Sequence, residues 1–502
     1  MPAVATSQAV RAAVRAPLTV ALAAAVAVGT ASCEDELPPQ AQLVVVVDTD
    51  LSAELATRLR VDLFTAAGVW FDSREFTRAS SRDWPASFGV VAPPSLADVI
   101  ARLRVYPEGH VRDYRGERFT ELGRAPGEPT AGAGPRLVRG EVDATPAEEP
   151  RPEVAVDRFV RLAFARETKR TIQVTLRATC AGTMASLVVN GRDVDPRAIA
   201  SCVARKDERL PLAAPAAPEE PLRAASLVGS WADAQPCERS DRRQRTCIPG
   251  GAFVFGDVDL DPQTTEFPVS ERIARVDRFW LDRTEVTVGA YRAALEAGFV
   301  EPVPVRVNDD PLTADPVDGC SFTTEPGDRE ALALTCVPWR TARAYCMWSG
   351  GDLPTEMRWE YATARAGKPA ETTFAWGDDA PTCDRASFGR AYIPPAPGFC
   401  QDEGSGPLVV GRPAGDVIPP GVMGLAGGVS EWMLDAAAPL DADCWRDAPL
   451  EDGACVRDDA RRSVRGGTWA GPPPLLVSAV RRSASEDARV ASIGFRCAYD
   501  VP

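Results

Sequence analysis

The residues in this chain best suited to chemistry are thirteen cysteines and one histidine. The cysteines form no Cys-x-x-Cys pair, so neither a thioredoxin-type redox site nor a zinc ribbon is predicted. His110 is the sole imidazole, which excludes zinc and iron sites built on two or three histidines. It follows Gly109 and is expected to be an exposed loop residue without an assigned role. The cysteines stand at positions 33, 180, 202, 237, 247, 320, 336, 346, 383, 400, 444, 455 and 497.

An odd number of cysteines in an exported chain indicates one thiol with a separate role. If that residue is Cys33, twelve cysteines remain for six disulfides in an oxidising compartment. Cys346 and Cys497 are then left to pair over a long span, although the sequence alone leaves the connectivity open. The other ten have close neighbours: Cys180 with Cys202, Cys237 with Cys247, Cys320 with Cys336, Cys383 with Cys400, and Cys444 with Cys455.

The first 32 residues have the pattern of a secretory signal. Arg11 and Arg15 precede an apolar run from 16 to 28, which is too short to span a membrane permanently. Small residues then lead to Ala-Ser-Cys, which resembles a bacterial lipobox with Thr30 at the usual Leu position. The resemblance implies acylation of Cys33 and a lipidated tether over 33–40, on the periplasmic face or cell surface of a bacterial membrane. The alternative is an ordinary cleaved signal followed by a disulfide cysteine.

The length and charge of the chain limit its class. A chain of 502 residues suggests two to four domains, and its net charge is −15. Neutralising phosphates needs a basic face, so no nucleic-acid partner is predicted.

The chain after the tether divides into two expected domains. Polar and apolar residues alternate at 59–63, 102–105 and 172–177, which predicts half-buried antiparallel strands. We therefore expect an all-β, sandwich-like domain of about seven strands over 41–205, closed by Cys180 and Cys202, with a long surface loop over 123–152. A Pro/Ala-rich linker follows over 206–240, and a second domain over 241–502.

Seven short strings in the second domain occur in a characteristic order. Thr287 and Thr355 are suited to cap two helices in these strings, and Gly350-Gly351 to end a third. Together the strings resemble the formylglycine-generating enzyme family, also called the sulfatase-modifying factor family. They are CIPGGAFVFG (247–256), FWLDRTEVTVGAYRAAL (279–295), VPWRTARAYCMWSGGDLPTEMRWEYATARAG (337–367), FAWGDDAP (374–381), GVMGLAGGVSEWMLD (421–435), RSVRGGTWAG (462–471) and IGFRCAYD (493–500).

The resemblance implies an irregular α+β domain related to C-type lectins. Active members oxidise a sulfatase cysteine to formylglycine, with copper held by two cysteines between the Gly-Gly-Ser-Trp-like and Gly-Phe-Arg motifs. Here that interval, 468–493, contains no Cys, Met or His. Gly471 stands at the first expected thiol position, and the second falls within 473–476. Copper is therefore not expected, and no catalytic residue is assigned. A related branch uses histidine-ligated iron, which a single histidine outside this region does not provide.

Two further features follow from the resemblance. A family disulfide corresponds to Cys346 and Cys497, which agrees with the pair left over above. The family also binds calcium at a motif where this chain has Gly427, Val429 and Glu431, so a weak calcium site is expected. Gly424 replaces the usual asparagine ligand, and calcium needs six to eight oxygens. The alternative is that Glu431 is a buried hydrogen-bonding residue.

We therefore expect a lipid-anchored, exported protein with a non-enzymatic domain that binds or scaffolds an unknown protein or glycan. One alternative is an oxidoreductase that modifies a protein cysteine. The other is a glycan-binding module with an aromatic platform, for which Trp376, Trp445 and Trp469 are candidates.

Overall fold

The computed structural model describes the chain from residue 42 onward, with gaps. The predicted signal segment, Cys33 and the tether lie outside the described residues, as does most of the predicted linker. No helix within the described part of the chain is long and apolar enough to cross a membrane. The described residues are 42–91, 97–113, 137–165, 169–183, 188–189, 192–193, 199–204, 209–212, 235–237, 241–242, 244–312, 319–391 and 398–501.

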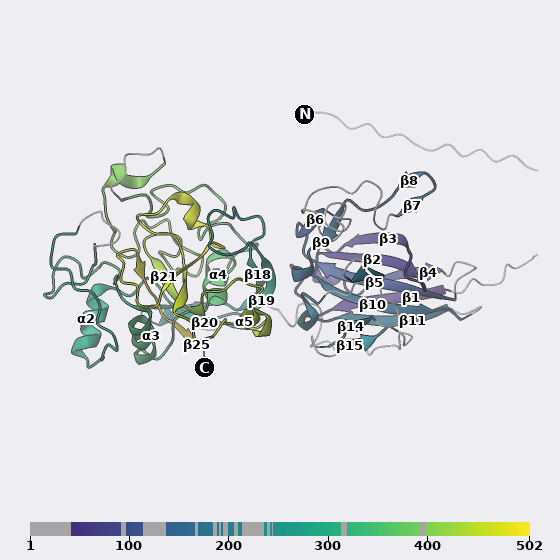
Figure 1. Cartoon of the computed structure of the whole chain (residues 1–502), viewed down its shortest axis with the longest axis horizontal. Helices are drawn as coiled ribbons and strands as arrows, with labels where there is room; N and C mark the ends of the chain where they lie inside the picture. The colour runs from purple at the N-terminus through teal and green to yellow at the C-terminus, as the bar shows by residue number, and fades with distance from the viewer. Residues whose placement is uncertain are drawn as a thin grey trace, which may run out of the picture. The chain divides into compact units, whose positions relative to one another are not determined.

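The N-terminal region contains two main sheets with seven strands among the described residues (Figure 1). Their apolar faces share one cluster of buried side chains, to which β1, β2, β4, β5, β10 and β11 contribute, so the sheets form a sandwich. The first sheet has the order β11 (Lys169–Leu176), β1 (Gln42–Thr49), β4 (Ala86–Val91). The second has the order β10 (Val156–Ala163), β5 (Asp98–Tyr106), β2 (Arg58–Thr65), β3 (Trp70–Thr77).

Two expectations for these strands are wrong. Strand β11 pairs with β1 in parallel, whereas the other neighbours in the two main sheets are antiparallel, as predicted. The polar positions of β2 and β5 are also not solvent-exposed. Asp62 is 0% exposed and holds Arg102 at 2.8 Å, and Arg104 is held by Asp157 and Glu149, each at 3.0 Å. Paired and hydrogen-bonded charges can be buried where single charges cannot.

Four short strand pairs accompany this sandwich among the described residues, and three of them reach into the segments predicted to be irregular. The end of the predicted 123–152 loop contains strands, and β15 lies inside the predicted linker. Disulfide Cys180–Cys202 is present, and both of its cysteines belong to the buried apolar cluster of the sandwich. The pairs are β6 (Val111–Asp113) with β9 (Glu148–Pro150), β7 (Val138–Arg139) with β8 (Val142–Asp143), β12 (Val188–Val189) with β13 (Arg192–Asp193), and β14 (Ala200–Cys202) with β15 (Arg209–Pro211).

The C-terminal region is an irregular α+β domain, as expected, with short strands and helices joined by long loops (Figure 1). One sheet has the order β16 (Asp241–Arg242), β17 (Arg245–Ile248), β20 (Phe279–Asp282), β25 (Ala498–Asp500). Another has the order β23 (Arg481–Ser485), β22 (Arg461–Arg465), β21 (Ser430–Ala436), β24 (Ile493–Gly494), and β18 (Gly251–Gly256) pairs with β19 (Glu271–Val276). The helices are α2 (Val288–Glu296), α3 (Trp339–Trp348), α4 (Glu356–Ala364) and α5 (Asp443–Asp447).

The helix caps predicted from the sequence are confirmed. Thr287 accepts a hydrogen bond from the backbone N–H of Ala290 at the start of α2, and Thr355 accepts one from Arg358 at the start of α4. Gly298 and Gly350 follow α2 and α3 with positive φ angles of 95° and 89°, which end the helices at low cost.

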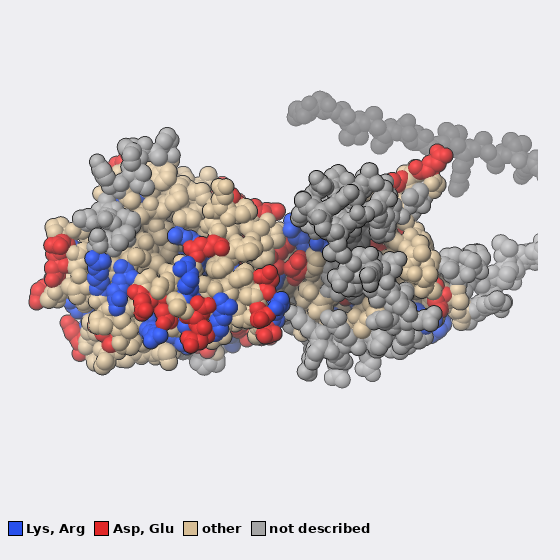
Figure 2. All heavy atoms as spheres, viewed as in Figure 1, with Lys and Arg blue, Asp and Glu red and all other residues tan. Residues whose placement is uncertain are grey.

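Strand β18 buries both of its faces and connects the two regions. Ala252 and Val254 belong to the apolar cluster of the N-terminal sandwich, whereas Phe253 and Phe255 pack into the C-terminal core. Successive side chains of a strand point to opposite faces, so one strand serves two cores. The face in Figure 2 shows basic side chains interleaved with acidic ones over the described residues, without a large basic patch.

Candidate functional site

The positions expected to carry two copper-binding thiols are filled by a turn and an apolar plug. Gly471 donates its N–H to the carbonyl of Thr468 at 3.0 Å and closes a tight turn. The 3₁₀ turn Pro473–Leu476 follows, and Leu476 is 1% exposed. A Cβ on Gly467 would lie 2.7 Å from the Cδ2 of Leu476, so the leucine packs directly over the glycine backbone. The family's thiol chemistry has no ligand at these positions.

All cysteines within the described residues are paired, and the pairs are the six expected ones. They are Cys180–Cys202, Cys237–Cys247, Cys320–Cys336, Cys346–Cys497, Cys383–Cys400 and Cys444–Cys455.

The motif that resembles a calcium site is occupied by a guanidinium group. Glu431 is 0% exposed, and its Oε1 and Oε2 accept hydrogen bonds from Nε of Arg496 at 2.8 and 2.9 Å. Trp359 donates its indole N–H to Oε2 at 2.9 Å. Arg496 also donates to the carbonyls of Met423 and Gly424, at 2.9 and 3.1 Å. Glu431 is thus a buried hydrogen-bonding residue that balances an arginine.

These residues do not fit a calcium ion. Both oxygens of Glu431 accept from Arg496, whose positive charge opposes a second cation at the same place. Gly424 offers no side-chain oxygen, and the described residues hold no group of three or more His, Cys, Asp or Glu side chains placed to bind a metal. Gly427 and Val429 would contribute only backbone carbonyls.

A second buried carboxyl, Glu285, lies beside this arginine. It is 4% exposed, its Oε2 accepts no hydrogen bond, and the nearest Arg496 nitrogen is 3.9 Å away. Burial raises the pKa of Glu285 to about 8, and the charge of Glu431 adds to the rise while Arg496 opposes it. A Cβ on Gly424 would lie 2.9 Å from both oxygens of Glu285, so this glycine leaves room for the carboxyl group.

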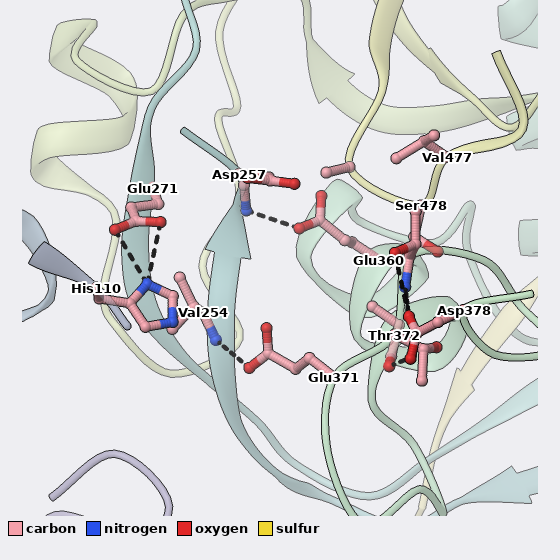
Figure 3. A pocket seen from close by; sticks show the side chains of 14 residues that line it. His110, Val254, Asp257, Glu271, Glu360, Glu371, Thr372, Asp378, Val477 and Ser478 are labelled. Carbon is pink, nitrogen blue, oxygen red and sulfur yellow. Dashed lines mark hydrogen bonds and ion pairs between the residues drawn. The ribbon is translucent and has the colours of Figure 1, made fainter. Parts of the chain in front are cut away.

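The described residues form a more open pocket of about 230 Å³ around His110, shown in Figure 3. His110 comes from the loop before β6, and its side chain is 31% exposed. Its Nδ1 lies 3.2 and 3.3 Å from the two carboxylate oxygens of Glu271 on β19. His110 is therefore a loop residue, as predicted, but it is only partly exposed and pairs with a buried carboxylate.

Electrostatics make the charged form of His110 favourable. Burial lowers the pKa of the imidazole, but the hydrogen bond and charge of Glu271 outweigh that effect, so the pKa of His110 is raised. Glu371, on the opposite wall, accepts a hydrogen bond from the N–H of Val254 at 2.8 Å. Desolvation raises the pKa of Glu371 to about 7, with a smaller contribution from Glu360.

The remaining wall of the pocket comes from α4 and from the segment after the 3₁₀ turn. Glu360 accepts from the N–H of Gly256 at 2.7 Å and from Arg465. Ser478 is 2% exposed, and its hydroxyl has no hydrogen-bond partner. Sequence reasoning found neither Ser478 nor the acidic walls, because no local motif joins β18, β19, α4 and this segment.

The tryptophans suggested as a glycan platform are mostly core residues. Trp445 and Trp469 are 0% exposed, and Trp469 donates its indole N–H to the carbonyl of Ala491. Trp376 is partly exposed and stacks on Phe374 with ring centres 5.1 Å apart. Three aligned, exposed rings are not present at these positions.

Comparison with known proteins identifies relatives of the C-terminal half. The family model described as "Sulfatase-modifying factor enzyme 1-like domain" matches residues 231–501. A formylglycine-generating enzyme of Streptomyces coelicolor is 28% identical over 315 residues, which cover 55% of this chain and 96% of that protein. An inactive C-alpha-formylglycine-generating enzyme 2 of Mus musculus is 27% identical over 288 residues, which cover 50% and 84%. Among solved structures, PvdO from Pseudomonas aeruginosa is 22% identical, with coverage of 51% and 94% and a TM-score of 0.39.

Proposed function

We propose a binding or scaffolding role for this chain, which belongs to the family of sulfatase-modifying factor enzyme 1-like domains. In this proposal the chain is an exported, lipid-anchored protein, and its family domain binds or scaffolds a ligand and does not oxidise cysteine. The observation that carries the proposal is the state of the cysteines. All twelve after Cys33 are in disulfides, and the 468–493 interval contains none.

Copper-dependent oxidation needs soft ligands, and copper(I) is held by thiolate or thioether groups. A disulfide sulfur carries no thiolate charge, so the described cysteines provide no such ligand. The interval also lacks methionine and histidine. The relatives include both enzymes and proteins named inactive, so membership of the family is compatible with either state.

Thiol titration and an activity assay test this proposal together. We expect no titratable thiol in the denatured, unreduced mature protein when Cys33 is acylated at its sulfur. We also expect no conversion of a peptide with the sequence Cys-x-Pro-x-Arg, with or without added copper. Two titratable thiols, or formylglycine detected by mass spectrometry, would overturn the non-enzymatic reading and favour the oxidoreductase.

The membrane anchor is tested separately at Cys33. We expect the wild type to partition into detergent and to carry acyl mass on Cys33, whereas Cys33→Ser remains soluble outside the cytoplasm. A soluble, unacylated wild type would refute the anchor. The ordinary cleaved signal would then be the better interpretation of residues 1–32.

The binding partner is proposed to be a protein or a glycan and not a nucleic acid. A net charge of −15 and the mixed charges on the face in Figure 2 support the exclusion of nucleic acid. A relation of the fold to C-type lectins would favour a glycan. The burial of Trp445 and Trp469 removes the aromatic platform on which that alternative depends.

A further inference from the structure

The pocket beside His110 is strongly acidic. Five carboxyl side chains line it, and His110 is the one side chain in the lining that can carry a positive charge. The nearby cations are already engaged, because Arg465 pairs with Glu360 and Lys368 donates to Thr372 and two backbone carbonyls. The five acidic residues are Asp257, Glu271, Glu360, Glu371 and Asp378.

An independent feature of the pocket is the unsatisfied hydroxyl of Ser478. The backbone of this residue is fixed, since its N–H donates to Thr373 at 2.8 Å and its carbonyl accepts from Arg465 at 2.9 Å. The hydroxyl is 98% buried by residue exposure, lacks a partner, and belongs to the lining drawn in Figure 3. A buried hydroxyl without a partner costs free energy, which a ligand that hydrogen-bonds to it would recover.

Two carboxyl groups have oxygens available to a ligand. Glu371 uses one oxygen for the N–H of Val254, and its other oxygen has no partner among the described residues. Asp378 uses Oδ1 for Thr373, and its Oδ2 is similarly without a partner there. Asp378 is an exposed residue, whereas the carboxyl group of Glu371 is partly desolvated in the pocket.

We propose that this pocket binds the ammonium or guanidinium group of a small organic amine or of a basic side chain. Carboxylates only accept hydrogen bonds, so the ligand must supply several donors, and a positive charge compensates the acidic walls. The Ser478 hydroxyl accepts one further N–H. A cavity of about 230 Å³ admits such a group with a short alkyl chain. This assignment depends on the binding function proposed above, and it specifies the chemical class of the ligand.

Direct binding to the purified mature chain tests the assignment. The probes are agmatine and n-butylamine, with 1-butanol as a neutral control for charge and glucose as a sugar. Isothermal titration calorimetry should detect the two cations and neither neutral probe. Affinity for agmatine should fall as sodium chloride is raised from about 50 to about 300 mM, because the Debye length shortens from roughly 14 Å to roughly 6 Å and charge pairs are screened.

Two variants probe the pocket, and one serves as a matched control. Binding is measured at pH 8.5, where Glu371, with its pKa of about 7, is ionised. There Glu371→Gln keeps an acceptor for Val254 and removes a charge, so it should weaken agmatine binding about tenfold. Ser478→Ala removes one hydroxyl and should weaken it roughly fivefold. Glu296→Gln removes the same charge from the exposed face of α2 and should change affinity less than about twofold.

Either of two results would overturn the assignment. One is glucose or 1-butanol binding at least as tightly as the cations. The other is equal agmatine affinity in Glu371→Gln, Ser478→Ala and the wild type. Both outcomes are independent of the thiol titration and the formylglycine assay, so a failure of this site is distinguishable from a failure of the proposed function.

Discussion

Disulfide Cys346–Cys497 should contribute more to stability than any short disulfide of the chain. It joins α3 to the segment before β25 and closes a loop with a sequence separation of 151 residues. Restricting the unfolded chain over that length stabilises the fold by about 5 kcal/mol in the loop-entropy model. Two short disulfides lie inside the loop, with separations of 17 and 11 residues. By shortening the effective loop they lower the estimate by only about 0.2 kcal/mol.

The matched perturbation uses alanine at both cysteines of a pair, which introduces no polar group into the core. Cys346→Ala with Cys497→Ala should therefore lower the free energy of unfolding by about 5 kcal/mol. The control is Cys237→Ala with Cys247→Ala, since that disulfide has a separation of 10 residues. The same model assigns it about 3 kcal/mol, so the two double variants should differ by about 2 kcal/mol.

The assay is guanidinium-induced unfolding of the mature chain without reductant. Fluorescence of the buried tryptophans, which include Trp359 and Trp432 in the C-terminal core, reports the transition. The midpoint and slope give the free energy for each double variant. If the long-loop variant loses no more stability than the short-loop variant, loop entropy is not what this disulfide contributes.

Three further predictions concern charge and metal. The pKa of His110 is raised in the fold, so protonated His110 stabilises the fold below pH 6.5, and this contribution is lost as the pH rises through the pKa of the folded state. His110→Gln should therefore lower the melting temperature at pH 5.5 more than at pH 8.5. Glu285 ionises in the unfolded chain near pH 4.5 but in the fold only near 8, so the wild type should lose stability over that range relative to Glu285→Gln, as measured by denaturant unfolding. Chelation should shift the melting temperature of the wild type by less than about 2 °C. The variant Gly424→Asn should have a lower melting temperature than the wild type, because the new Cβ would meet the carboxyl group of Glu285.

The features predictable from the sequence are those encoded by neighbouring residues. The caps at Thr287 and Thr355 follow from a side-chain oxygen placed before a helical segment. The short disulfides follow from spacing, and the family follows from the order of its motifs. The caps and short disulfides depend on residues that are close in the sequence. The family depends on the order of its motifs along the chain, which can be recognised without knowledge of the packing.

The features that the sequence does not reveal arise from contacts between distant segments. Alternation in β2 indicates a strand, but it does not show that the face carrying Asp62 will be covered and paired with Arg102 on β5. The parallel pairing of β1 with β11 joins strands more than a hundred residues apart. Likewise, Ser478 and Glu371 line one pocket although they are more than a hundred residues apart, because the N–H of Ser478 donates to the carbonyl of Thr373 and the N–H of Val254 donates to Glu371.

The residues that hold the C-terminal fold differ from those that would perform thiol chemistry. Arg465 pairs with Glu356 and Glu360, and Arg496 pairs with Glu431, all of them buried. Removing one partner of such a pair leaves an uncompensated charge and costs about 3–5 kcal/mol. The turn at 471–476 belongs to none of these ion pairs, and Leu476 is its buried side chain. A chain can therefore keep the charge network, and with it the fold, without thiols in that turn. For this reason membership of the family establishes the architecture, whereas activity has to be decided at the turn itself.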